Sequence, residues 1–210
     1  MAAGRPRGFD VEKALGEALG VFLAKGYDGA SLADLTQAMG INPPSLYAAF
    51  GNKEGLFRQV LDRYLKERNE VLQRALAAPT AAETVERFLR GSIDDQTLDD
   101  RAHGCLLVQG ALACGDQGNQ VRQDLSEARL SGQLPLEARF ARAQESGDIQ
   151  ADVDLEVLAR YVCVLVHGLA VQAASGVSRD RLHAVVDMTM HGWHGIVGAQ
   201  ARKRSKLKVV

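Results

Sequence analysis

Apolar residues recur at intervals of three and four along most of the chain, which is the spacing of one face of an α-helix. The pattern predicts helices over residues 9–25, 31–39, 43–50, 52–78, 81–98, 103–114, 120–146, 155–175 and 179–200. Outside these segments, no stretch of four or more residues alternates apolar and polar positions as a strand does. The sequence therefore predicts an all-α protein of nine helices, arranged as a three-helix head and a six-helix body.

Two of the predicted helices, over 31–39 and 43–50, are short and closely spaced. Ser31 and Asn42 stand where each helix begins, and both residue types are favoured as N-caps. Pro43 follows in the first turn, where its missing N–H costs nothing. These signals place the start of both short helices.

The connection between the two short helices contains Gly40, which permits a tight turn. This spacing is typical of a helix-turn-helix. Residues 40–52 carry no charged side chain, and a narrow, uncharged helix is suited to enter a major groove. An ordinary corner between two helices has the same geometry, so geometry alone leaves both interpretations open.

Residues 32–57, with the sequence LADLTQAMGINPPSLYAAFGNKEGLF, resemble the DNA-binding signature of the TetR family of transcriptional regulators. The matching features are Gly26-Tyr27, Ser31, the turn at Gly40, the trio Leu46, Tyr47 and Phe50, and the stretch 52–56. The chain beyond residue 70 matches the family only in size and helix count. Pro43-Pro44 and Ala48-Ala49 depart from the bulkier residues often found there, and this concerns the operator sequence rather than DNA binding itself.

The resemblance implies three regions. A helix-turn-helix DNA-binding domain is expected over residues 1–52, and a helical domain for effector binding and dimerisation over 53–200. A basic tail, 201–210, follows. The tail is interpreted as a solvated terminus, with phosphate binding as the alternative.

The matched residues are assigned roles in DNA contact. We expect the Lys53 amine and the hydroxyls of Ser31 and Tyr47 to contact phosphates. The start of the second short helix is expected to approach base edges, and the N-terminal arginines to reach the minor groove or the backbone. The full set of candidates is Arg5, Arg7, Ser31, Asn42, Pro43, Pro44, Ser45, Tyr47 and Lys53.

Small residues recur at helical spacing in the last two predicted helices, which suits a close crossing of helices between two copies of the chain. Packing within one subunit would use the same composition. The resemblance favours a homodimer, because family members bind palindromic operators with two heads. The interface is expected to include Cys163, His167, Met188, Gly192, Gly195 and Ala199, with Ala159 and Ala184 on the same faces.

The composition is that of an ordinary globular protein, with 46% hydrophobic and 24% charged residues, which excludes a disordered or fibrous chain. A net charge of −1 argues against a protein that coats nucleic acid indiscriminately, but it allows a small DNA-reading element. The charge-free stretch 161–178 contains His167 and two glycines, so a buried helix is expected there and not a membrane span. With no signal-peptide pattern at the start, the protein is expected to be cytoplasmic.

Cys105 follows Gly104 at the start of a predicted helix, where the helix dipole favours a thiolate. A sensor of electrophiles has this arrangement, but so does a small buried core residue, which is the commoner role of a cysteine. His191 and His194 are spaced to share a metal, but no third ligand accompanies them. No metal and no cofactor are therefore expected.

The sequence contains no P-loop, dinucleotide fingerprint, serine-hydrolase elbow or zinc-protease motif, so an enzyme is not expected. We expect a repressor that binds a palindromic double-stranded operator as a dimer and is released by a small apolar effector. The effector would bind among the middle helices, between about residues 61 and 171. One alternative is thiol sensing at Cys105. Another is a helical adaptor that binds no DNA, against which Tyr47 and Lys53 argue because folding needs neither.

Overall fold

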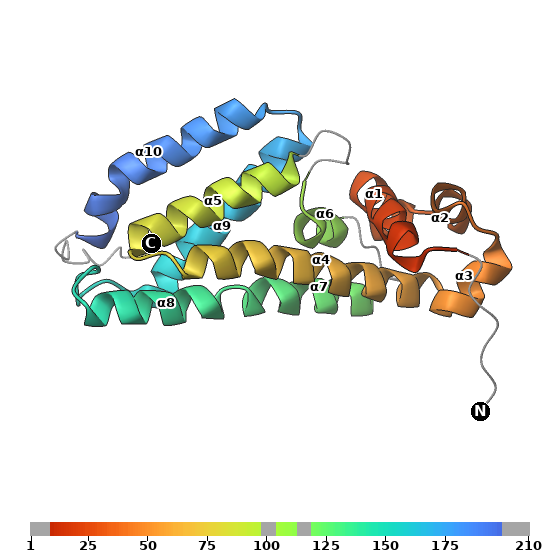
Figure 1. The fold of residues 1–210 in the computed structure, drawn as a ribbon, viewed down its shortest axis with the longest axis horizontal. Helices are drawn as coiled ribbons and strands as arrows, with labels where there is room; N and C mark the ends of the chain where they lie inside the picture. The colour runs from red at the N-terminus through yellow and green to blue at the C-terminus, as the bar shows by residue number, and fades with distance from the viewer. Residues whose placement is uncertain (1–8, 98–103, 113–118, 199–210) are drawn as a thin grey trace, which may run out of the picture. The chain divides into compact units, whose positions relative to one another are not determined.

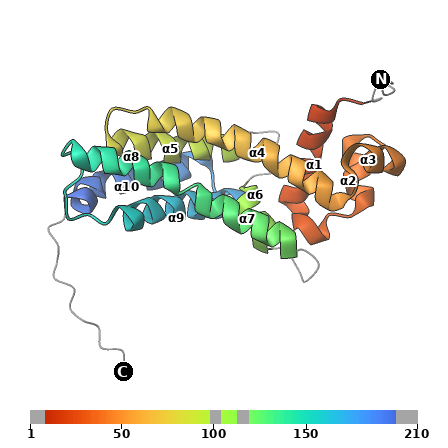
Figure 2. The same cartoon turned by 90° about the horizontal axis from the view of Figure 1, so that it is seen from below.

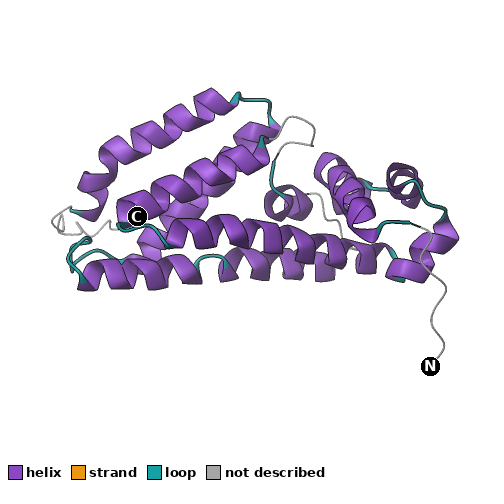
Figure 3. Ribbon diagram, viewed as in Figure 1, coloured by secondary structure: helices purple, strands orange, loops and turns teal. Residues whose placement is uncertain are grey.

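The computed structural model describes residues 9–97, 104–112 and 119–198, and all regular structure within them is helical (Figures 1 and 3). The all-α class is therefore as predicted. Arg5, Arg7, Ala199 and the tail 201–210 lie outside the described residues. The helices are α1 (Val11–Gly29), α2 (Leu32–Met39), α3 (Pro43–Phe50), α4 (Lys53–Leu76), α5 (Ala81–Gln96), α6 (Leu106–Leu112), α7 (Asn119–Ser131), α8 (Leu134–Glu145), α9 (Leu155–Ala174) and α10 (Arg179–Val197).

The chain folds into two compact units, each assembled from two stretches of sequence. Unit 1 contains Met1–Asn69 and Gln96–Arg129, and unit 2 contains Glu70–Asp95 and Leu130–Val210. The first boundary falls within α4, whereas the sequence predicted a functional boundary at residue 52. Packing thus groups α1 to α3 with most of α4, α6 and α7, while the functional division into three regions stays a prediction.

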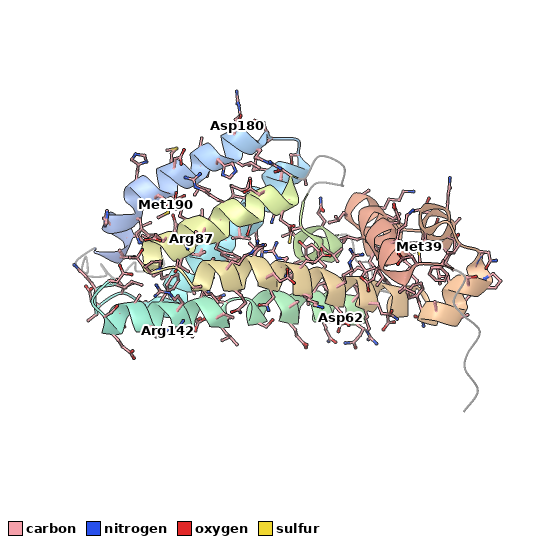
Figure 4. All side chains as sticks on the ribbon, in the orientation of Figure 1. Met39, Asp62, Arg87, Arg142, Asp180 and Met190 are labelled. Carbon is pink, nitrogen blue, oxygen red and sulfur yellow. The ribbon has the colours of Figure 1, made fainter. Side chains whose placement is uncertain are left out.

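Unit 1 is held together by α1, which packs against both α2 and α6. An aromatic cluster joins α1 to α4: the rings of Phe22 and Tyr27 each meet the ring of Phe57 edge-on, at 5.0 and 5.2 Å between centroids. Met39, the last residue of α2, is buried in the same unit (Figure 4). Such aromatic pairs add about 0.5–1.5 kcal/mol beyond the burial of their area.

The first helix breaks where the sequence predicted its end. Gly26 has φ 68° and ψ 179°, a conformation outside the helical region that glycine adopts without a steric penalty. Helical turns resume after it and continue to Gly29, four residues beyond the predicted end at residue 25.

In unit 2, α9 packs against α8 and against α10 (Figure 2). The side chain of Arg139 on α8 is 7% exposed and donates hydrogen bonds to the carbonyl oxygens of Ala78 and Pro79, at 3.1 and 3.0 Å. These carbonyls follow the end of α4, where the helix dipole favours a positive charge. Arg139 therefore fixes the turn between α4 and α5.

One predicted element was wrong. The helix expected over 120–146 is two helices, α7 and α8, separated at Gly132 and Gln133. Pro135 lies in the first turn of α8 and has no N–H to donate to the Ser131 carbonyl, so one hydrogen bond of a continuous helix is missing there. The apolar spacing continued across the break and concealed it.

Among the described residues, α9 is the one helix long and apolar enough to cross a membrane by length and composition. One face of α9 packs into the core of unit 2, at Leu158, Ala159, Val162, Val166, Leu169, Ala170 and Ala173. The helix is not buried on all sides, because 39% of its apolar window is buried and Val157, Val164 and Val171 are exposed.

Candidate nucleic-acid interface

The second helix begins with a capping box between Ser31 and Asp34. The Ser31 Oγ accepts a hydrogen bond from the Asp34 N–H at 3.0 Å, and the Asp34 carboxylate accepts from the Ser31 N–H at 3.1 Å. The Ser31 hydroxyl donates to the same carboxylate at 2.7 Å. The Ser31 hydroxyl was predicted to donate to a phosphate, but in this structure it donates its hydrogen bond to Asp34, and Ser31 caps the helix.

The Asp34 carboxylate forms an ion pair with Lys25 in addition to the capping box. The Lys25 amine lies 2.7 Å from its carboxylate and, together with the bonds from Ser31, lowers the pKa of Asp34 from 3.8 to about 2. The pair joins α1 to α2. The start of α2 is thus fixed by one ionised carboxylate.

The turn between α2 and α3 has the geometry that the sequence predicted. Gly40 has φ 64°, and its N–H donates to carbonyls in the last turn of α2. Ile41 follows and donates its N–H to the Thr36 carbonyl at 3.1 Å. The Asn42 Oδ1 accepts from the Ser45 N–H at 2.9 Å and caps α3, with Pro43 in its first turn.

The third helix presents an uncharged surface, which we call the recognition face: Pro43, Pro44, Tyr47 and Ala48, all exposed. Tyr47 is the largest of the four, and its side chain is 49% exposed. Leu46 and Phe50 on the opposite side are buried, and Ser45 is half-buried. The structure therefore brings together the predicted base-contacting residues on one short, narrow element.

Lys53, at the start of α4, lies against the end of α1. Its Nζ is 4.6 Å from the centroid of the Tyr27 ring and donates to the Asp28 carbonyl at 3.4 Å. The preceding Asn52 caps the helix by accepting from the Gly55 N–H at 2.7 Å. The predicted phosphate contact would require the Lys53 amine to turn from these partners toward DNA.

Gly55 is a structural requirement that the sequence reasoning missed. A Cβ atom on this residue would overlap the carbonyl oxygen of Phe50, the last residue of α3. Glycine is therefore needed where α4 starts close to the recognition helix. Its signal was present in the matched stretch 52–56, where it was not singled out.

Unit 2 carries a second exposed, mostly apolar surface on α9 and α10. Its exposed apolar members are Val157, Val164, Val171, Val185 and Met188, which we call the α9–α10 surface together with the glycines Gly168, Gly192 and Gly195. A Cβ on any of these three glycines would meet no atom of the described chain within 4 Å. These glycines are not needed for packing inside the subunit.

The remaining predicted interface residues lie differently. Cys163 is half-buried and packs against the core of unit 2, and His167 is half-buried with interactions of its own. Ala159 was expected on the same face, and this expectation was wrong because Ala159 is buried inside unit 2. Ala184 is exposed, as expected.

Cys105, the candidate sensor, is completely buried in unit 1. The Tyr64 hydroxyl of α4 donates to its Sγ at 3.1 Å, and the Arg68 guanidinium donates to the Tyr64 oxygen at 3.4 Å. Burial raises the pKa of Tyr64, so its hydroxyl keeps the proton that it donates. The structure favours a buried core position, which the sequence analysis gave as the commoner role of a cysteine.

Among residues 9–97, 104–112 and 119–198, no group of three or more His, Cys, Asp and Glu side chains is arranged to hold a metal ion. The His191 ring lies instead against the Asp187 carbonyl oxygen, with Nδ1 at 2.6 Å. Its geometry is that of a local helix contact.

Both parts of the chain match known sequence families. Residues 14–60 match the family described as "Bacterial regulatory proteins, tetR family", and residues 82–189 match "Tetracyclin repressor-like, C-terminal domain". The chain is 29% identical over 196 residues to the HTH-type transcriptional repressor ComR of Escherichia coli (strain K12), covering 92% of this chain and 93% of ComR. It is 30% identical over 186 residues to the repressor BdcR of the same organism, covering 88% and 89%.

Solved structures agree with these matches. A cysteine mutant of the TetR family transcriptional regulator CifR, complexed with 26-base-pair double-strand operator DNA, is 44% identical to this chain and superposes with a TM-score of 0.84. The match covers 90% of this chain and 100% of the CifR chain. A regulator from Rhodococcus sp. RHA1 is 42% identical, with a TM-score of 0.60 over 87% of this chain and 97% of its own.

Proposed function

The chain belongs to the TetR family of bacterial regulatory proteins, and we propose that it is a repressor that binds a palindromic double-stranded operator as a homodimer. The observation that carries the proposal is the recognition face of α3, which is uncharged, exposed and held by caps at both of its neighbouring turns. A small apolar effector bound among the middle helices would release the DNA. The family consists of transcriptional regulators and not of enzymes.

The proposed DNA contacts follow from what each side chain can still offer. Tyr47 presents a hydroxyl from an exposed position, and Pro43 and Pro44 present apolar rings that suit thymine methyl groups. The side chains of Ser31 and Asn42 form the hydrogen bonds that cap α2 and α3, so both residues position these helices. The groups that remain for DNA are the second lone pair of the Ser31 hydroxyl and the Asn42 side-chain NH2. Arg5 and Arg7 are proposed to extend the contact in the adjacent groove.

Relatives support both the repressor activity and the operator. ComR and BdcR are named as HTH-type transcriptional repressors, and CifR has been crystallised on double-strand operator DNA. The matches to this chain include the helix-turn-helix and the helical body, which argues against an adaptor that retains the fold without binding DNA. A repressor would act in the cytoplasm, where the operator is.

The homodimer is proposed to form through the α9–α10 surface. Exposed valines and Met188 supply apolar area, and the three glycines allow the helices of a partner to approach closely. Two copies would then present two recognition helices to successive major grooves, about 34 Å apart.

The test of DNA binding is a gel shift on operator DNA selected from a random pool, repeated over a range of salt concentrations. Lys53→Ala is expected to weaken binding to all sequences about tenfold and to lower the slope of log affinity against log salt by about one, because one phosphate contact is lost. Lys66→Ala, an exposed lysine on the same helix, is the matched control. Ser45→Ala should change the preferred base at one position instead. An unchanged slope in Lys53→Ala would contradict this placement on DNA.

Thiol sensing at Cys105 is a second proposal, favoured by its contact with Tyr64 of α4. An adduct on a completely buried sulfur would force Tyr64 and its helix to move. The test is to treat the protein with N-ethylmaleimide, whose double bond takes up the sulfur and the thiol proton, and then to measure operator affinity. Loss of affinity in the natural chain but not in Cys105→Ser would support sensing, and equal loss in both would rule it out.

A further inference from the structure

Gln96, the last residue of α5, is a buried amide without a partner. Its side chain is 4% exposed, and within the described part of the chain neither its Nε2 nor its Oε1 makes a hydrogen bond. Leaving such a group unpaired is unfavourable, because it has given up its hydrogen bonds to water without gaining others. By contrast, the buried Gln133 donates from its Nε2 to Glu137 at 2.6 Å. Gln96 therefore has a donor and an acceptor that the fold itself does not use.

The backbone of Gln96 contacts Gly104, a residue whose own surroundings are closely fitted. The Gly104 N–H donates to the backbone carbonyl of Gln96 at 3.4 Å. The side-chain amide of Gln109 lies so close to Gly104 that a Cβ on Gly104 would be 2.7 Å from it. Gly104 also has φ 116°, which other residues rarely adopt. Two glutamines thus contact one glycine that cannot be replaced without strain.

We propose that the Gln96 amide is the anchor for an effector that carries a carboxamide-like group, such as a primary amide or a lactam. A side-chain amide presents an N–H donor and a carbonyl acceptor side by side, and a second amide satisfies both with two reciprocal hydrogen bonds. A ligand with a carbonyl alone leaves one of the two unpaired, and an ionised carboxylate sets its charge against the Oε1. The inference rests on the proposed function, in which a small molecule releases the DNA.

The same residues connect this anchor to the DNA-binding helices of unit 1. Gly104 is followed by Cys105, whose thiol accepts the hydrogen bond from Tyr64 on α4. The helix that begins after it, α6, packs against α1. A ligand on Gln96 that displaces Gly104 therefore acts on both α1 and α4, and these two helices position α2 and α3.

The experiment measures binding of simple probes to the full chain by thermal unfolding and calorimetry. The probes are benzamide and 2-pyrrolidone, which carry the amide group, with acetophenone and toluene as comparisons that lack the donor. At least one of the two amides is expected to raise the melting temperature of the natural protein, and acetophenone and toluene to raise it less. Gln96→Leu is expected to weaken amide binding at least tenfold.

The matched control is Gln144→Leu. The Gln144 amide donates to the carbonyls of Gln150 and Val153, at 2.9 and 3.1 Å, so this variant should unfold at a lower temperature while it binds the probes as the natural protein does. Without probe, Gln96→Leu should unfold at the same temperature as the natural protein or above it, because no hydrogen bond is lost.

Three outcomes would overturn the proposal. They are no binding of either amide to the natural protein, equal binding by Gln96→Leu, and a lower melting temperature of Gln96→Leu without probe, which would show that the amide has a structural partner such as water. Operator binding by the natural protein is measured separately. Its failure would remove the proposed function, while the probe results would still decide whether Gln96 holds an amide.

Discussion

In the described part of the chain, the recognition face in unit 1 and the α9–α10 surface in unit 2 are both built from exposed uncharged residues, and they differ in what surrounds them. The recognition face of α3 is small and carries the Tyr47 hydroxyl, which can bind phosphate. Lys53 follows three residues after α3, and its amine can bind phosphate once it turns from Tyr27 and Asp28. On the α9–α10 surface, the exposed side chains are aliphatic and offer no hydroxyl or amine to a phosphate. Missing charge alone does not identify a partner.

Several charged residues on the helices that carry the second surface form ion pairs within unit 2. Asp187 on α10 accepts from Arg90 on α5, and this guanidinium lowers the pKa of Asp187. On α9, Arg160 lies 2.8 Å from Glu156. A surface whose charges are balanced within the subunit is suited to a second protein copy, whereas DNA requires positive groups that remain available to phosphates.

The largest effect is expected from a charge placed on the α9–α10 surface. Met188 is 77% exposed in the subunit, so Met188→Glu should fold normally, yet it would bury an unpaired carboxylate in a dimer. We expect the dimer dissociation constant to rise at least 100-fold in sedimentation equilibrium. Leu134→Glu, a similarly exposed apolar residue on α8, is the control. A Met188→Glu protein that stays dimeric would exclude this surface as the interface.

A glutamate on the recognition face should have the reverse effect: DNA binding is lost and the dimer remains. Ala48→Glu on α3 should abolish operator binding because the new carboxylate repels phosphates, while the protein stays dimeric. Ala48→Ser changes size a little and adds no charge, so it should retain non-specific DNA binding. Gel shifts and sedimentation on both variants check this. If Ala48→Glu bound DNA normally, α3 would not be the helix that enters the groove.

A smaller effect tests how the recognition helix is held. Gly55→Ala should lower the free energy of unfolding by about 1–3 kcal/mol, because its methyl group overlaps the Phe50 carbonyl and the backbone must shift. Gly20→Ala on α1, where nothing lies within 4 Å of the new Cβ, should instead raise it by about 0.5–1 kcal/mol. Urea denaturation of both variants measures the difference. A stabilised Gly55→Ala would disprove the close approach.

The smallest effect concerns acid. Because the pKa of Asp34 is lowered to about 2, its stabilising contribution is present above pH 3.8 and is lost as the pH falls toward 2. Titration of the Asp34 carboxyl by NMR should give that value in the natural protein. Lys25→Ala should move the pKa upward, since the Lys25 contact is its largest cause. An unchanged pKa would show that Ser31 alone holds the carboxylate ionised.

The helix-turn-helix was predictable from sequence because its bonds are local. The caps at Ser31 and Asn42 each join residues three apart, and Gly40 is needed for a turn next to them. Even the use of the Ser31 hydroxyl could have been inferred, since serine followed three residues later by an acidic side chain is a capping-box pattern, and Asp34 completes it.

Features that depend on distant residues were not predictable in the same way. Cys105 was judged from its place at a helix start, but its burial and its bond to Tyr64 depend on the packing of α4 and α6. The position of Ala159 in the helical pattern fits a face exposed for dimerisation and a face in the core equally well, and the fold shows that it is in the core. The partnerless amide of Gln96 is likewise a property of three-dimensional packing.

The discontinuous make-up of unit 1 has a consequence for synthesis on the ribosome. The helix-turn-helix is made first, but α6, which covers α1, belongs to the stretch Gln96–Arg129 of the same unit. At about 5–20 residues per second, the nascent chain carries α1 without this cover for a time on the order of seconds. In that interval the part of α1 that α6 later covers is exposed to solvent. The DNA-reading part of the chain is thus translated early but completed only after a segment of unit 2 has been made.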